Sequence, residues 1–289
     1  MRCKYLFVFV FIVFLTYSCE VESIVNEGKD YPESKQEFEL LVSYASPTDI
    51  KYAQGMDIFD GHVFQSYSDG TIDIIDLESC SFVQTIGPLY DEDGTTVLHM
   101  NDLSIVSKEN ISWLIIPSNV VNGPCFIYSI NNISDGEYSI NQEFLIHPPE
   151  LDIALYRGVT QYFSNNLELL QVSYQREGND GYGDIHMEYY TIDSLKSLPF
   201  YTKQWEMNYE KLWAMQGATI EGDYAYLAVG VPHGVAKIYR IDINSGSITC
   251  FKNFRAEEDT LKNEEMQGVA YYGGYLFFST TYGLYKLLK

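Results

Sequence analysis

The sequence predicts an all-β protein built as a five-bladed β-propeller, and three observations support this fold class. Five segments of the chain repeat one pattern at intervals of roughly 50 residues. Each repeat alternates short apolar strands with residues typical of hairpin turns. Tyrosine, which suits half-buried strands, is the commonest aromatic residue with 25 copies, against 3 tryptophans.

The second residue of each repeat sets the spacing. This position is glycine in four copies and asparagine in one, namely Gly55, Asn101, Gly158, Gly217 and Gly268. The intervals of 46, 57, 59 and 51 residues fit a four-stranded blade with loop insertions. Because asparagine is the non-glycine residue that best tolerates a positive φ, we expect an unusual backbone conformation at this position.

Within each repeat, an apolar strand follows the glycine position and ends in turn residues. The turns are predicted at Asp60-Gly61, Glu109-Asn110, Asn165-Asn166, 221–223 and Gly273-Gly274. Two more strands follow, and a more polar fourth strand closes the first four repeats at 82–86, 138–144, 202–205 and 248–254. A radial blade predicts this loss of hydrophobicity, because its inner strands are packed on both faces.

The fifth repeat ends after its third strand, so its fourth strand must come from elsewhere. Residues 37–44 (EFELLVSY) alternate between polar and apolar and lie just before the first repeat. We expect them to pair as the outer strand of the last blade, which closes the ring and covers the sheet edge. A pair of packed sheets is the alternative architecture.

The first 36 residues predict export and anchoring. Arg2 and Lys4 precede an apolar run of 11 residues, Tyr5 to Leu15, which is too short to span a membrane. Residues 1–18 are therefore predicted to be a signal peptide. Cys19 follows the small Ser18 and resembles the lipid-modified cysteine of bacterial lipoproteins, although Thr16 stands where such signals usually carry leucine.

The following polar segment, residues 19–36, is expected to be a tether between the lipid and a propeller at 37–289. Acidic residues after such a cysteine resemble the surface-export signals of Bacteroidetes lipoproteins. The sequence thus predicts a lipid-anchored protein of the cell envelope, at the outer membrane or cell surface. Secretion or a periplasmic location without the anchor is the alternative.

Charge restricts the partners. The formal net charge is −22, and removal of residues 1–18, which carry Arg2 and Lys4 and no acid, makes it −24. Such a surface repels nucleic acid and anionic lipid, so membrane contact is expected through the anchor alone. The acidity favours solubility, with a cation-binding or basic-partner surface as the alternative. Of the remaining cysteines, Cys80, Cys125 and Cys250 are expected to be buried free thiols.

The repeats resemble those of the plant and bacterial glutaminyl cyclase family, which is a five-bladed propeller. The resemblance rests on Gln54-Gly55, Gln216-Gly217 and Gln267-Gly268, and on the run QGVAYYGGYLFFSTTYGLYKL from Gln267. It covers the blade cores and implies a catalytic glutamate. The matching positions are Gln65 in the first repeat and Phe278 in the fifth, and neither side chain can shuttle a proton.

Other motifs point to no cofactor and no metal. The loop Asp91-Glu92-Asp93-Gly94 lacks complete calcium-loop spacing and is interpreted as a solvated loop. The five histidines are scattered without metal-ligand spacing. His186 and His233 follow loops where they could line a mouth, although a structural role is favoured for both.

The architecture predicts a ring at one mouth of the central channel, where the innermost strands begin. Its members are the opening residues of the repeats: Gln54, Met100 with Asn101, Arg157, Gln216 and Gln267. Arg157 is a cation that could bind an anionic group there. Alternatively, the glutamine amides cross-link neighbouring blades.

Aromatic residues near repeat boundaries form a second candidate surface for sugars or peptides, and they are Tyr156, Tyr174, Tyr182, Trp205 and Trp213. Packing between blades is the alternative role. We therefore expect a binding module for a glycan, a peptide or a protein partner. The alternative is an enzyme, a hydrolase, lyase or cyclotransferase, with its site in the central funnel.

Overall fold

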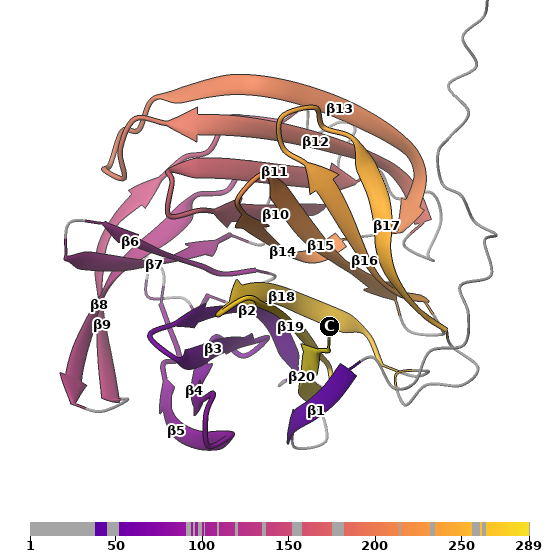
Figure 1. The fold of residues 1–289 in the computed structure, drawn as a ribbon. Coiled ribbons are helices and arrows are strands. Elements are labelled where there is room, and N and C mark those ends of the chain that lie inside the picture. Colours follow the sequence, from indigo (N-terminus) through magenta and orange to yellow (C-terminus); the bar gives the residue numbers. More distant parts are fainter. Residues whose placement is uncertain are drawn as a thin grey trace, which may run out of the picture.

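The computed structural model confirms the predicted five-bladed propeller (Figure 1). It describes residues 38–44, 52–90, 94, 96–97, 100, 102–108, 110–118, 121–134, 137–151, 158–174, 182–213, 215–231, 235–255, 261 and 264–288. Residues 1–37, which hold the predicted signal peptide, Cys19 and tether, lie outside these ranges.

Five four-stranded antiparallel sheets form the blades, each named here from its innermost strand outwards. Blade I consists of β2 (Ala53–Phe59), β3 (His62–Tyr67), β4 (Ile72–Asp76) and β5 (Ser81–Ile86). Blade II consists of β6 (Ser104–Lys108), β7 (Ile111–Pro117), β8 (Cys125–Ser134) and β9 (Glu137–Ile146). Blade III consists of β10 (Gly158–Phe163), β11 (Glu168–Tyr174), β12 (Tyr182–Ile192) and β13 (Tyr201–Trp213). Blade IV consists of β14 (Met215–Glu221), β15 (Tyr224–Val231), β16 (Val235–Asp242) and β17 (Ile248–Arg255). Blade V consists of β18 (Met266–Tyr272), β19 (Tyr275–Thr280), β20 (Gly283–Leu287) and β1 (Phe38–Ser43).

The ring closes as predicted. Strand β1 pairs antiparallel with β20, with Phe38 opposite Leu287 and Ser43 opposite Gly283. The Phe38 ring is 5% exposed and makes edge contacts with Phe254 and Phe278, so β1 joins the core as well as the sheet. Burying a side chain of this size contributes about 1.5–3 kcal/mol. The first strand of each blade contacts the first strand of the next, and β18 contacts β2.

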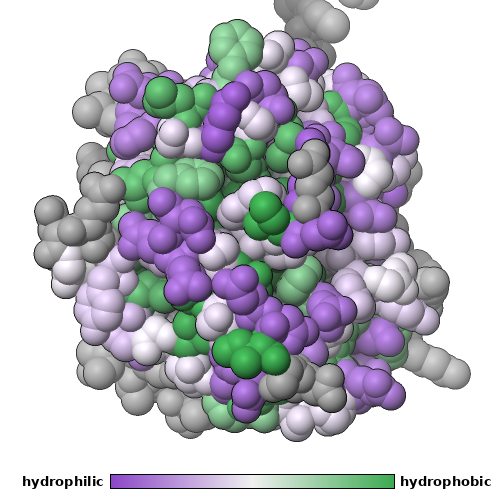
Figure 2. Space-filling model, turned by 90° about the vertical axis from the view of Figure 1, so that its left-hand side faces the viewer, coloured by the Kyte–Doolittle hydropathy of each residue, from purple (hydrophilic) through white to green (hydrophobic). Residues whose placement is uncertain are grey.

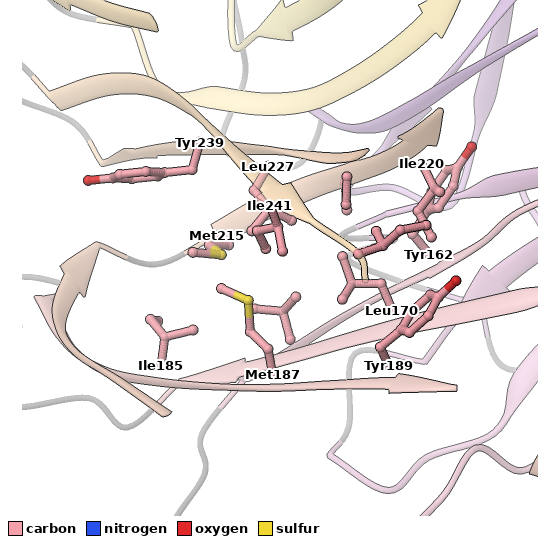
Figure 3. Packing of buried hydrophobic residues seen from close by; sticks show 14 of the residues in the cluster. Tyr162, Leu170, Ile185, Met187, Tyr189, Met215, Ile220, Leu227, Tyr239 and Ile241 are labelled. Carbon is pink, nitrogen blue, oxygen red and sulfur yellow. The ribbon is translucent and has the colours of Figure 1, made fainter. Parts of the chain in front are cut away.

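Each blade packs on the next through its own apolar cluster, which excludes the alternative of two packed sheets. The cluster between blades III and IV joins Leu170 and Met187 to Leu227 and Ile241 (Figure 3). Equivalent clusters fill the other four junctions. The sheets also show the predicted gradient, because β2 is buried along six of its seven residues whereas β5 has no buried residue.

The predicted hairpin turns form at one end of the blades. Asp60 and Gly61 have φ of 48° and 75°, and Asn110 has φ of 67°. In blade III the left-handed residue is Leu167, with φ of 60°, one position after the predicted asparagine pair. We call this side the turn end of the propeller and the opposite side, where the innermost strands begin, the mouth end.

The outside of the propeller is mixed in polarity. Figure 2 shows one side of the molecule, where hydrophobic residues form separate groups among hydrophilic ones. Leu198 and Phe200, in the connection between β12 and β13, are 83% and 70% exposed. Among the described residues, no helix is long and apolar enough to cross a membrane.

The cysteine prediction is partly wrong. Cys80, Cys125 and Cys250 are all free thiols, as expected, but Cys125 is the one that is buried. Cys80 is partly exposed in the turn before β5, and Cys250 is exposed on β17. Both lie on or beside outer strands, whose side chains meet water in a propeller blade.

Candidate functional site

The innermost strands approach one another closely at the mouth end, and the repeat glycines make this possible. A Cβ atom on Gly55 would lie 2.3 Å from Cα of Asp102, and one on Gly217 would lie 2.7 Å from Cα of Gly268. These glycines do not have positive φ, so the expectation of an unusual backbone is wrong for Gly55, Gly217 and Gly268. Glycine is needed there because adjacent backbones touch.

Two of the predicted mouth residues meet at a carboxylate that sequence analysis missed. Gln216 Nε2 of blade IV donates a hydrogen bond to Oε1 of Glu265, at 2.9 Å, and the side chain of Gln267 also bonds this carboxylate. Burial raises the pKa of Glu265, and the hydrogen bonds from the two glutamines oppose that shift. Glu265 therefore sits as a partly exposed acceptor between two amides at the junction of blades IV and V.

The predicted ring of five residues stays a prediction, because two of its members lie outside the described residues. Gln54 is 4% exposed, and its Nε2 donates to the adjacent carbonyl of Ala53 at 3.0 Å, so it does not join Gln216 and Gln267. Gln267 itself is 2% exposed. Asn101 and Arg157 lie outside the described residues. The alternative role, in which a glutamine amide cross-links neighbouring blades, is seen at Gln216, which bonds Glu265 just before blade V.

Gln65, which the resemblance between the repeats aligns with a catalytic glutamate, is buried in the core. Its side chain is fully buried, and Nε2 donates to the carbonyl of Gly55 at 2.9 Å and to that of Ser66 at 3.0 Å. The Tyr44 hydroxyl donates to Oε1 of Gln65 at 3.0 Å. Both ends of the amide are thus engaged by the protein, and Phe278, the matching residue in blade V, is buried as well.

Two buried carboxyl groups connect the innermost parts of different blades. Asp57 accepts hydrogen bonds from the amides of Ile58 and Ile105, at 2.8 and 2.7 Å, which ties blade I to blade II. Asp102 accepts from the amide of Leu103 at 2.9 Å and from that of Ala218 in blade IV at 3.2 Å. These acceptors satisfy backbone donors that would otherwise be buried without partners.

Burial controls the protonation of this pair. It raises the pKa of Asp57 to about 7, although the hydrogen bonds from Ile105 and Ile58 act in the opposite direction. Burial also holds the pKa of Asp102 well above its usual range, and the charge of Asp57 adds to the shift. The hydroxyl of Thr219 donates to that of Tyr162 nearby, at 3.3 Å. The arrangement is structural, because both carboxyls bind backbone amides.

A polar row crosses blade III on the face toward blade II. Gln161 bonds Gln171 at 2.5 Å, Gln171 bonds Glu188 at 3.2 Å, and Lys203 bonds Glu188 at 2.6 Å. Burial alone would raise the pKa of Glu188, but hydrogen bonds from His186 and Lys203 lower it to about 2. His186 is thus a hydrogen-bonded structural residue, as favoured from the sequence.

Of the candidate aromatic residues, the described ones pack between blades. Trp205 stacks on Tyr189 and donates from Nε1 to the carbonyl of Ile243 at 2.6 Å, which joins blades III and IV. Tyr174 packs on the same cluster. Tyr156 and the side chains of Tyr182 and Trp213 lie outside the described part of the chain.

The position of Glu265 in the sequence could have predicted its place at the mouth. Glu264 and Glu265 directly precede the Met-Gln-Gly that opens the fifth repeat, so they fall at the mouth by position. The interpretations of the loop at 91–93, of His99 and of His233 stay predictions, because these residues lie outside the described ranges. Within the described ranges, no group of three or more His, Cys, Asp or Glu residues could hold a metal ion.

Comparison with known proteins defines the class of the protein as a five-bladed β-propeller. No family model matches the chain, and no curated protein matches it. One solved structure with the same fold is the crystal structure of Myxococcus xanthus glutaminyl cyclase. The two chains share 13% sequence identity at a TM-score of 0.51, and the match covers 87% of this chain and 95% of that one. The resemblance in fold inferred from the repeats is confirmed.

Proposed function

We propose that the protein is a lipid-anchored propeller of the cell envelope that binds a peptide or a segment of a partner protein at its mouth end. The observation that favours binding over catalysis is the state of Gln65. This residue replaces the glutamate that the fold resemblance implies, and its amide is buried with both ends hydrogen-bonded. Such a group has no proton to exchange and no free face for a substrate.

The mouth favours a peptide over the other ligands expected from the sequence. Glu265 offers acceptor oxygens between the amides of Gln216 and Gln267. Tyr52 lies nearby, because burial raises the pKa of its hydroxyl and the charge of Glu265 adds to that shift. A peptide presents amide and amino donors that match a carboxylate flanked by amides. The acidic surface adds attraction for a cationic segment.

A peptide array probed with the purified mature protein tests this binding. We expect peptides that carry a free amino group or a lysine to be selected, and Glu265→Gln to weaken their binding about tenfold or more. Glu143→Gln is the matched control, because Glu143 is exposed on the outer strand β9. Equal binding by Glu265→Gln would place the ligand elsewhere, and Arg157→Ala tests whether the predicted cation contributes.

Enzymatic activity is the second candidate, because Glu265 is a carboxyl with a raised pKa at the mouth. One solved structure with this fold is a glutaminyl cyclase, so the relevant assay measures pyroglutamate formation from peptides with N-terminal glutamine. We expect no turnover above background. Turnover that disappears in Glu265→Gln would instead assign a cyclotransferase to the mouth.

The anchor is supported by Arg2, Lys4, the apolar run at 5–15 and the placement of Cys19. Mass spectrometry of the mature N-terminus from the native host tests it. We expect a lipid-modified Cys19 as the first residue. An unmodified N-terminus at any other residue would contradict the anchor and favour secretion or a periplasmic location.

A further inference from the structure

Arg240 on β16 has no anionic partner among the described residues of this strongly acidic protein. Its guanidinium carbon lies 4.6 Å from the ring centroid of Tyr224 and 5.6 Å from that of Phe251. Among the residues that the structure describes, no carboxylate forms an ion pair with Arg240, and its guanidinium donates no hydrogen bond to them. Two aromatic rings therefore hold the group in place while its five N–H donors remain available.

More aromatic side chains surround this arginine. Tyr226 packs edge-on against Phe251 at 5.3 Å and stacks on Tyr271 of blade V with an interplanar angle of 14°. Burial raises the pKa of Tyr226, and the charge of Arg240 is the next largest influence and acts in the opposite direction. Tyr271, Tyr224 and the Glu221 carboxylate also act on this hydroxyl, so these polar groups lie close together.

The cluster lies at the turn end of the junction between blades IV and V. Tyr224 opens β15 directly after the turn at Gly222, and Tyr271 lies two residues before the turn at Gly273. Tyr224 is 37% exposed, whereas Tyr226, Tyr271 and Arg240 are partly buried. The site therefore opens to solvent at the end of the blades opposite Glu265, and it is independent of the function proposed for the mouth.

We propose that this cluster, formed by Tyr224, Tyr226, Arg240, Phe251 and Tyr271, binds a carboxylate-bearing sugar unit of an acidic polysaccharide. The guanidinium matches the two oxygens of a carboxylate in a bidentate geometry. Tyrosine rings present flat apolar faces to the C–H face of a pyranose ring, and their hydroxyls exchange hydrogen bonds with sugar hydroxyls. The negative net charge repels anionic polymers in general, so recognition requires this local cation.

The choice of a sugar over an acidic peptide rests on the composition of the cluster. Four aromatic rings and a single cation suit one charged unit with a flat apolar face, whereas an acidic peptide would be better served by several cations. The Glu221 carboxylate beside the tyrosines can accept hydrogen bonds from sugar hydroxyls, but it would repel a second acidic side chain.

Calorimetric titration of the mature protein with oligosaccharides of galacturonate, mannuronate and glucuronate tests the proposal. We expect binding to at least one of them, and at least about tenfold weaker binding after Arg240→Gln or Tyr224→Ala. The same oligosaccharide with its carboxylates reduced to alcohols should lose most of the affinity. The variants must keep the melting temperature of the unmodified protein, so that loss of binding is not loss of fold.

Lys286→Gln is the matched control, because Lys286 Nζ also lies over an aromatic ring, 3.9 Å from the centroid of Tyr275 on blade V. This variant should bind as the unmodified protein does. Absence of binding across the panel, equal binding of the reduced oligosaccharide, or full binding by Arg240→Gln would each overturn the proposal. Displacement by poly-glutamate at equal concentration of carboxylates would overturn the choice of a sugar.

Discussion

The junction between blades IV and V carries a charged group at each of its ends, and the protein treats the two differently. At the mouth end, Glu265 is fixed by hydrogen bonds from Gln216 and Gln267. At the turn end, Arg240 is fixed by the rings of Tyr224 and Phe251. Hydrogen bonds use the acceptor sites of a carboxylate, whereas a cation–π contact leaves the N–H donors of the guanidinium free.

This difference extends to two buried carboxyl groups among the innermost parts of the blades. Asp57 and Asp102 use their oxygens to bind backbone amides of neighbouring blades, so their ionisation is coupled to the closure of the ring. Arg240 instead contacts the rings of Tyr224 and Phe251. The contribution of Asp57 and Asp102 to stability should therefore depend on pH.

The largest expected effect that separates the two ends is the pH dependence of stability. The folded protein holds a proton on Asp57 up to about pH 7, whereas the unfolded chain loses it near pH 4. The stabilisation is therefore complete below about pH 4 and is lost as pH rises through about 7, by at most on the order of 4 kcal/mol. Urea unfolding between about pH 5 and pH 8 measures this loss.

The hydrogen bond with Glu188 also raises the pKa of His186. His186 therefore makes stability fall with rising pH as Asp57 does, and the pH dependence of the unmodified protein alone does not separate the two groups. The difference between the unmodified protein and Asp57→Asn isolates the contribution of the Asp57 carboxyl. We expect the variant to show a flatter dependence on pH, and Arg240→Gln to keep the original one. Identical slopes for Asp57→Asn and the unmodified protein would mean that the Asp57 carboxyl is ionised in the folded protein.

The next effect concerns how tightly the backbone is packed at the two ends. Gly217→Ala would place a Cβ atom 2.7 Å from Cα of Gly268, so the strands must move apart, and we expect a loss of about 1–3 kcal/mol or more. Gly222 has φ of 58° with nothing within 4 Å of the added atom, so Gly222→Ala should cost about 1 kcal/mol from backbone conformation alone. Urea unfolding of both variants ranks the two ends. A larger loss for Gly222→Ala would reverse the comparison.

These contrasts also show which features the sequence could predict. Repeat spacing and hairpin residues predicted the five blades, and the alternation of 37–44 predicted that β1 would close blade V, because both depend on local patterns. The glycine positions were found correctly, but for the wrong reason. A close approach between Gly217 and Gly268 joins segments about 50 residues apart, and no local pattern distinguishes it from a need for positive φ.

Functional groups were harder to predict, for the same reason. Gln216 and Gln267 were expected at the mouth because each opens a repeat, whereas Glu265, which joins them, lies just before its repeat and was missed. Cross-strand neighbours assemble the cluster around Arg240 from β15, β16, β17 and β18. Tyrosine is so frequent in this chain that Tyr224 or Tyr226 alone carries no signal.

The smallest expected effect is the change in stability when Arg240 is replaced, and it separates a binding residue from a packing residue. Arg240→Gln loses two cation–π contacts, each worth about 0.5–1 kcal/mol at a partly exposed site. It also removes a partly buried charge that has no ion-pair partner within the described ranges. These contributions oppose each other, so we expect urea unfolding to change by less than about 1 kcal/mol. Lys286→Gln, which alters a cation–π pair on blade V, should change stability by a similar amount. A loss above about 2 kcal/mol confined to Arg240→Gln would mean that the guanidinium stabilises the blade junction as part of its packing, and the two ends of the junction would then both be structural.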